Sequence, residues 1–228
     1  VRALILRINS PGGTMADSEA LYLSLRGVAA HKPVIAVMGG TAASGGYMAA
    51  LAAEHIVARN STITGSIGVI LQTAEVSRML SDLGIVTEAI KSAPLKGVPS
   101  PFEALNESGR AAAQSVVDDM YDLFLGLLIE RRSMARPVAE QLADGRVYTG
   151  RQAVANGLVD EIGGEQQALA WLDSQRGVSP ALPLYDLEVD ETENVVERLV
   201  SSVGGAVLPR RLMLDGLLAV WHPGLGRE

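Results

Sequence analysis

KPVIAVMGGTAASGGYMAA, residues 32–50, joins a short apolar run to a stretch of small residues. The apolar run at 33–39 is typical of a buried strand, and residues 41–53 predict a helix rich in small side chains. Ser44 lies at this strand-to-helix junction, among residues too small to cover its hydroxyl. The N–H of Gly45 would then point outwards from the first helical turn, where negative charge is favoured. By itself, Ser44 is equally consistent with a simple helix cap.

The segments on either side continue an alternation of strand and helix patterns. The predicted strands are residues 1–8, 33–39, 55–58 and 85–91, and the predicted helices are residues 15–30, 41–53 and 74–83. Strands separated by helices pair in parallel through right-handed crossovers, which indicates an α/β fold.

Beyond a proline-rich loop at 92–101 the sequence is mostly helical. A long helix is predicted from Asn106 or Ser108 to about Arg132, followed by helices after Pro137, near Gly150 and at 164–174. From Gly177 the pattern weakens, and an apolar patch at 212–221 needs a partner surface. We expect one domain at 1–175 and an appendage at 176–228. Because the chain opens inside a core-like strand, we also expect part of the domain to precede Val1.

Composition excludes several classes of function. The net charge is −7 and no long basic run occurs, which argues against nucleic-acid binding. Cysteine is absent, so disulfides, thiolate catalysis and cysteine-ligated metals are excluded. The three histidines, His31, His55 and His222, are too far apart in the sequence to predict a metal site. The sequence contains no run of 18 apolar residues, so it predicts no membrane-spanning helix.

An attacking serine needs a base within hydrogen-bonding reach. His55 is more typical of a strand end or core position, and His31 of a charge at a helix C-terminus. A lysine can act as the base where burial favours its neutral amine. Lys96 is the first choice because its neighbours on both sides are uncharged, and Lys91 is its rival.

A second glycine-rich turn, Asn9-Ser10-Pro11-Gly12-Gly13, also follows an apolar strand. Its proline fixes one turn residue, and its glycines permit positive φ, which exposes backbone N–H groups. Taken alone, it is more often just a turn.

Several separated motifs together resemble one known family. They are VRALILRINSPGG at 1–13, KPVIAVMGGTAASGGYMAA at 32–50, STITGSIGVI at 61–70, KSAPLKGVPSPF at 91–102 and DGRVYTGRQAVANGLVDEIGG at 144–164. In this order and spacing they resemble the signal peptide peptidase A family of serine–lysine peptidases, which share the Clp/crotonase-like fold. The resemblance spans residues 1 to about 175 and does not cover the C-terminal segment.

The resemblance implies roles for individual residues. Ser44 matches the family's nucleophile, Lys96 its general base, and Ser66 the serine that supports the lysine by a hydrogen bond. The sequence departs from the family at 93–95, Ala-Pro-Leu, where the family often has a glycine and a polar pair. This departure affects the expected conformation of the loop rather than the chemistry.

The same resemblance implies an oxyanion hole, partners and a location. The backbone N–H of Gly45 would act with that of Gly12 or Gly13, a choice that the sequence leaves open. No cofactor or metal is implied. The expected substrates are cleaved signal peptides and other short apolar segments near a membrane. Each chain has one copy of the serine motif and one copy of the lysine motif, so the resemblance implies a homo-oligomer with shared active sites. A membrane anchor preceding Val1, at the bacterial inner membrane, is expected as well, although the chain itself has a soluble composition.

Alternative functions remain open at this point. An acyl-CoA-binding enzyme of the crotonase fold would have a similar oxyanion hole but would use carboxylates. A Clp-type Ser-His-Asp peptidase is a nearer rival, but no histidine lies between Ser66 and Lys96. A non-catalytic assembly scaffold is the third alternative, and the presence of both Ser44 and Lys96 argues against it.

Overall fold

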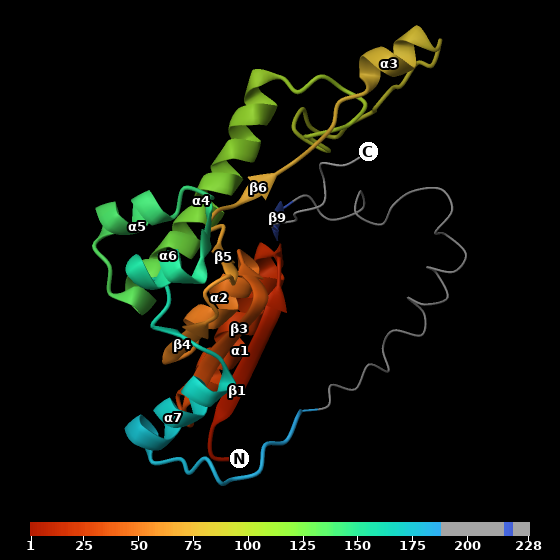
Figure 1. The fold of residues 1–228 in the computed structure, drawn as a ribbon. Helices are drawn as coiled ribbons and strands as arrows, with labels where there is room; N and C mark the ends of the chain where they lie inside the picture. Colours follow the sequence, from red (N-terminus) through yellow and green to blue (C-terminus); the bar gives the residue numbers. More distant parts are fainter. Residues whose placement is uncertain (188–216, 221–228) are drawn as a thin grey trace.

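The computed structural model describes residues 1–187 and the backbone of residues 217–220 (Figure 1). The described residues form a mixed α/β fold around a curled, mostly parallel sheet. Its strands are β1 (Leu4–Ser10), β3 (Val34–Ala43), β4 (His55–Ala58), β5 (Ile63–Gly65), β7 (Val147–Thr149) and β8 (Glu161–Ile162). The α/β class predicted from the sequence is confirmed.

Strand β3 lies at the centre of this sheet and is long enough to pair with three neighbouring strands. Along one edge it pairs in parallel with β1. Along the other edge it pairs with β4 at its beginning and with β5 at its end, both in parallel. The last strand on this side, β7, runs antiparallel to β5, a departure from the all-parallel expectation.

Helices cover both faces of the sheet. Successive side chains of a strand point to opposite faces, and the apolar side chains of β3 on each face pack against helices. The helices are α1 (Met15–Ala29), α2 (Gly45–Leu51), α4 (Glu107–Arg132), α5 (Arg136–Leu142), α6 (Gly150–Ala155) and α7 (Glu165–Arg176). On one face, Ala36 and Met38 of β3 belong to the main core with α1, α2 and the C-terminal half of α4. On the other face, Ile35 packs with Ala168 and Leu172 of α7.

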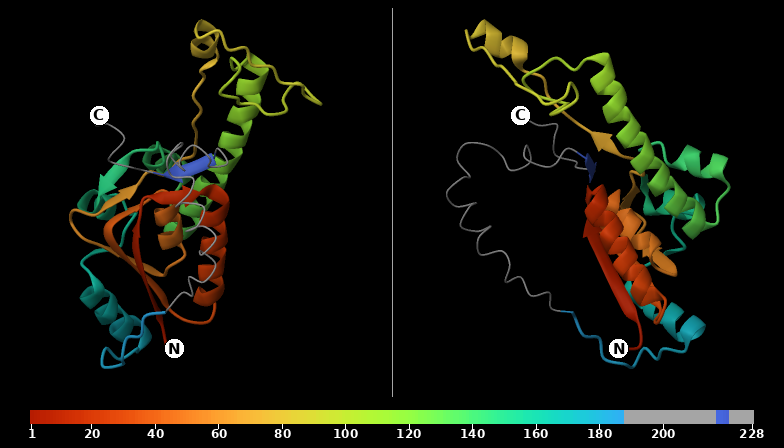
Figure 2. Two further views of the ribbon diagram at one scale, coloured as in Figure 1. Left: turned by 90° about the vertical axis from the view of Figure 1, so that its right-hand side faces the viewer. Right: turned by 180° about the vertical axis from the view of Figure 1, so that it is seen from behind.

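Residues 72–106, here called the arm, extend away from the sheet together with the N-terminal half of α4 (Figures 1 and 2). The arm contains the short helix α3 (Ser77–Asp82), which buries none of its residues. No residue of the arm is buried. Helix α4 joins the arm to the body, since its buried apolar residues are Phe124, Leu125 and Leu128 near its C-terminal end.

A small second sheet lies beside the glycine-rich turn. It consists of β2 (Gly12–Thr14), β9 (Leu217–Val220) and β6 (Ile70–Leu71). Strand β9 lies between the other two and pairs antiparallel with both. It is the described part of the predicted apolar patch at 212–221, whose other residues lie outside the described chain, as does His222.

Most predicted helices are confirmed, and the junctions differ in detail. Asn106 caps α4 by accepting a hydrogen bond from Gly109 N at 2.8 Å. Residues 41–43, predicted as helix, instead continue β3, because they pair with β5. Residues 85–91, predicted as extended strand, form neither helix nor strand. The boundary between a domain at 1–175 and an appendage stays a prediction.

Candidate active site

Ser44 lies at the turn between β3 and α2, in a backbone conformation that is unusual for serine. Its φ is 55° and its ψ is −119°. A non-glycine residue held at positive φ costs roughly 1–3 kcal/mol, and such strain is common at functional sites. The turn is fixed by hydrogen bonds from Ser44 N to Gly65 O at 2.8 Å and from Met48 N to Ser44 O at 2.9 Å.

The possibility that Ser44 serves only as a helix cap is not supported. Its side chain makes no capping hydrogen bond to α2, although it occupies the N-cap position. Thr14, at the N-cap of α1, does accept such a bond from Asp17 N. The backbone of the turn therefore fixes the position of the Ser44 side chain, which accepts no hydrogen bond from the N–H groups at the start of α2. The residue is only 1% exposed.

Ser66 lies next to Ser44, as their places on neighbouring strands require. Ala43 of β3 is paired with Gly65 of β5, so the two serines follow paired residues at the carboxyl ends of parallel strands. Ser66 also has a positive φ, 50°, and its N–H donates to Arg146 O at 2.8 Å. The structure thus brings these two predicted site residues together.

Gly45 and Gly13 also lie side by side. A Cβ at position 45 would lie 3.1 Å from the backbone nitrogen of Gly13. Gly12, with a φ of 117°, turns the chain, and its N–H donates to Ser10 Oγ at 3.2 Å. Of the two glycines left open by the sequence, Gly13 is therefore the one whose N–H adjoins Gly45.

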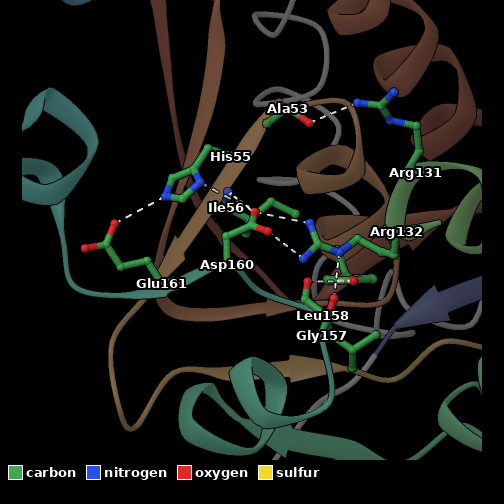
Figure 3. A network of polar contacts seen from close by, with 10 residues as sticks. Ala53, His55, Ile56, Arg131, Arg132, Gly157, Leu158, Asp160 and Glu161 are labelled. Carbon is green, nitrogen blue, oxygen red and sulfur yellow. Dashed lines mark hydrogen bonds and ion pairs between the residues drawn. The ribbon is translucent and has the colours of Figure 1, made fainter. Parts of the chain in front are cut away.

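Tyr47, one helical turn beyond Ser44, anchors α2 in the core. Its ring is fully buried, and its hydroxyl donates to the carbonyl of Leu158 at 2.8 Å. Burial raises the pKa of the Tyr47 phenol, which keeps the hydroxyl as a donor. Arg132 reinforces the same region by donating to the Gly157 carbonyl at 2.7 Å and to Asp160 (Figure 3).

Lys96 lies on the arm and is exposed. Its backbone N–H donates to Ala93 O at 3.0 Å, and within residues 1–187 its ammonium has no hydrogen-bond or ion-pair partner. The loop of Lys96 adjoins the N-terminus of α4, since Pro94 and Val98 line a small cavity with Asn106. From there to the core at Phe124, α4 runs roughly 25 Å at about 1.5 Å per residue. The arm that carries Lys96 extends away from the sheet whose strand β3 leads to Ser44 (Figures 1 and 2).

The two other candidate bases, Lys91 and His55, have structural partners elsewhere in the chain. The ammonium of Lys91 is half-buried and forms an ion pair with Glu103 within the arm. His55 is the first residue of β4 and pairs with Ile35, near the beginning of β3. Ser44 follows the other end of β3, nine residues beyond Ile35, which is roughly 30 Å at about 3.3 Å per residue. The position of His55 at a strand end agrees with the interpretation from the sequence.

His55 belongs instead to a structural network at the far end of the sheet (Figure 3). Its Nε2 lies 3.2 Å from Glu161 Oε2, and its ring stacks on Trp171 at 5.0 Å between centroids. The carboxylate of Asp160 accepts from Ile56 N at 2.7 Å and pairs with Arg132. This network joins β4 to the segment before β8, away from the candidate site.

Within the described parts of the chain, no group of three or more histidine or acidic side chains is placed to hold a metal ion. No helix among the described residues has the length and apolar character needed to cross a membrane.

Comparisons with known proteins identify the family of the chain. The family model for peptidase family S49 matches residues 26–179. A protein described as a protease in Synechocystis sp. is 37% identical over 197 residues, covering 86% of this chain and 71% of its own length. Protease 4 of Salmonella typhi is 39% identical over 225 residues, which are 98% of this chain but 35% of the relative. The serine protease SPPA of Arabidopsis thaliana chloroplasts is 34% identical, over 95% of this chain and 32% of its own.

These matches and the fold define the class of protein as a peptidase of mixed α/β type. The chain belongs to peptidase family S49, the signal peptide peptidase A family that the motifs resemble. It spans about a third of the length of the Salmonella and Arabidopsis relatives.

Proposed function

We propose that this protein is a serine endopeptidase in which Ser44 is the nucleophile and Lys96 of a neighbouring copy is the general base. The observation that carries the proposal is the geometry of Ser44. The Ser44 side chain makes no capping hydrogen bond and lies at a strained turn. Ser66 adjoins this turn, and so do Gly45 and Gly13, here called the glycine pair. Membership of a peptidase family supports the same reaction class.

The reaction follows from the chemistry of these groups. The neutral amine of Lys96 takes the proton of Ser44 as Oγ attacks the scissile carbonyl carbon, and the N–H groups of Gly45 and Gly13 hold the resulting oxyanion. The loss of one such donor typically costs about 2.7–4 kcal/mol of transition-state stabilisation. The charged amine then gives its proton to the leaving nitrogen as the C–N bond breaks. Water, activated by the same lysine, hydrolyses the acyl ester. Ser66 orients the lysine amine.

The separation of Ser44 from Lys96 supports a site shared between copies. Many exposed large apolar side chains lie on the arm that carries Lys96, and a partner that docks there would remove them from water. They are Met79, Leu83, Ile85, Val86, Ile90, Leu95 and Phe102. A second copy of the chain is the partner that brings a serine to this lysine. Docking would bury Lys96 and so favour its neutral amine.

The proposed substrate is an extended peptide. Strand β9 shows how β2 and β6 hold an extended chain between them by antiparallel pairing beside the glycine pair. A peptide that took the place of β9 would gain main-chain hydrogen bonds from both strands without demanding particular side chains. The family resemblance extends the proposal to cleaved signal peptides and apolar segments near the bacterial inner membrane.

The test is cleavage of a fluorogenic apolar peptide by wild type, Ser44→Ala and Lys96→Ala. Both variants should lose activity at least 100-fold while remaining folded, and Lys91→Ala is the matched control because Lys91 pairs with Glu103 on the same arm. A mixture of the two inactive variants should regain part of the activity if sites are shared. Activity that survives Lys96→Ala would overturn the choice of base.

Other outcomes would point to the alternative functions. An inert wild type that is stabilised by acyl-CoA would favour the crotonase-type enzyme. An inert wild type that neither binds acyl-CoA nor reacts with a serine-directed fluorophosphonate would favour the assembly scaffold.

A further inference from the structure

Ser18, on the first turn of α1, is a buried polar side chain next to the candidate site. Within the described chain the buried polar residues are Ser18, Ser44, Thr62 and Thr64. The two threonines tie strands together, since Thr62 Oγ1 donates to Gly39 O and Thr64 Oγ1 donates to Ala42 O, each at 2.7 Å. Ser18 has no such role in the sheet.

The side chain of Ser18 fills the space between Gly13 and Gly45. Its Oγ is 3.8 Å from where a Cβ on Gly13 would be and only 2.1 Å from where a Cβ on Gly45 would be. The hydroxyl is fixed in this place because it donates to the carbonyl of Thr14 at 2.7 Å. One side chain thus packs directly against Gly45 and lies beside Gly13, the two residues to which the oxyanion hole is assigned.

Helix α1 does not itself require this hydrogen bond. A serine that bonds back to the carbonyl four residues earlier is slightly unfavourable in a helix, and alanine is a better helix former. Ser24 makes the same bond to Ala20 O at 2.9 Å on the exposed side of α1. The two serines therefore differ in what they touch rather than in their local geometry.

We propose that Ser18 is a positioning residue that sets the spacing between the Gly13 and Gly45 backbone donors. This inference rests on the proposed function, because it assumes that these two N–H groups stabilise the oxyanion. A larger side chain at position 18 would push α2 away from β2, and alanine would leave the gap between them unfilled.

The expected effect is on the chemical step rather than on binding of the substrate. Oxyanion donors act only when they lie about 2.7–3.1 Å from the developing charge. A misplacement of about 1 Å can cost on the order of 100-fold in rate. An interaction made only in the transition state changes kcat and leaves KM unchanged.

The experiment compares Ser18→Val and Ser18→Ala with the matched controls Ser24→Val and Ser24→Ala. We expect kcat to fall on the order of 100-fold for Ser18→Val and about tenfold for Ser18→Ala, with KM within about threefold of wild type. Affinity for a peptide boronate, which forms the tetrahedral adduct, should fall in parallel with kcat/KM. The Ser24 variants should keep the wild-type kcat. Circular dichroism checks that each variant is folded, and Ser18→Ala decides the question if Ser18→Val does not fold.

The outcomes separate this inference from the proposed function. If wild type cleaves the peptide, Ser44→Ala does not, and folded Ser18→Ala keeps the wild-type kcat and boronate affinity, only the role of Ser18 is overturned. A rise in KM at constant kcat would overturn it too, because Ser18 would then act on substrate binding. If wild type and Ser44→Ala are equally inert, the proposed function falls and this inference falls with it.

Discussion

All of α2, which begins after Ser44, is buried, whereas no residue of the arm, which carries Lys96, is buried. The turn at Ser44 is held by backbone hydrogen bonds from both sides, and Tyr47 anchors the helix that follows it. The loop of Lys96 is held by a short turn and by its contact with the start of α4. The two halves of the proposed dyad are thus built in different ways.

Under the proposed function, this difference would divide the work of the site between two kinds of structure. The nucleophile and the glycine donors need fixed positions, and the folded body of one chain supplies them through close packing. The lysine needs burial, which an exposed arm gains only by docking on another surface. Ser44 should therefore be sensitive to changes of less than an ångström, whereas Lys96 should be sensitive to association between copies.

The largest effect is expected from Gly45→Ala, which tests the body's half of the site. The new Cβ would lie 2.1 Å from Ser18 Oγ and 3.1 Å from the backbone nitrogen of Gly13, so the Ser18 hydroxyl must rotate away and α2 must give way slightly at β2. Activity on the fluorogenic peptide should fall on the order of 100-fold or more, as for the loss of an oxyanion donor. The control is Gly27→Ala on α1, where a Cβ meets nothing within 4 Å. It should keep full activity and gain about 0.5–1 kcal/mol of stability. Equal activity of the two variants would contradict the close packing inferred here.

The second prediction compares the two halves of α4. Phe124→Ala removes a fully buried ring and should lower the free energy of unfolding by about 3–5 kcal/mol. Val116→Ala, at a side chain that is 43% exposed, should change it by less than about 0.5 kcal/mol. Urea denaturation of both variants measures the difference. Similar losses would mean that the N-terminal half of α4 is packed as firmly as the C-terminal half.

Much of the body could be predicted from the sequence because its signals are local. The apolar runs of β3 and β4, and Asn106 before the long periodic segment of α4, predicted these elements nearly at their observed positions. The small residues around Ser44 predicted the strand-to-helix junction, but the expectation that they leave Ser44 uncovered was wrong, because the residue is only 1% exposed. The extension of β3 through 41–43 was missed, because pairing with β5 outweighs the helical preference of small residues.

The site was harder to predict, because its geometry depends on contacts between distant segments. The choice between Gly12 and Gly13 required the packing of β2 against α2. Ser18 gave no signal, since a lone serine near a helix N-terminus is common. The separation of Lys96 from Ser44 depends on the direction of α4, which periodicity does not reveal.

The smallest effect is expected on the arm and tests whether it docks on a second copy. Ile90 is 97% exposed, so Ile90→Asp should leave the free energy of unfolding within about 0.5 kcal/mol of wild type. If its side chain is buried between copies, a carboxylate there weakens association, because an unpaired charge is costly to desolvate. Peptidase activity at dilute protein should then fall several-fold and recover in part at higher concentration. Sedimentation should show a matching shift to smaller assemblies. The control is Val138→Asp on α5, an exposed apolar residue outside the arm, which should change neither quantity. Equal behaviour of the two variants would mean that the arm does not mediate association, and Lys96 would then need another route to Ser44.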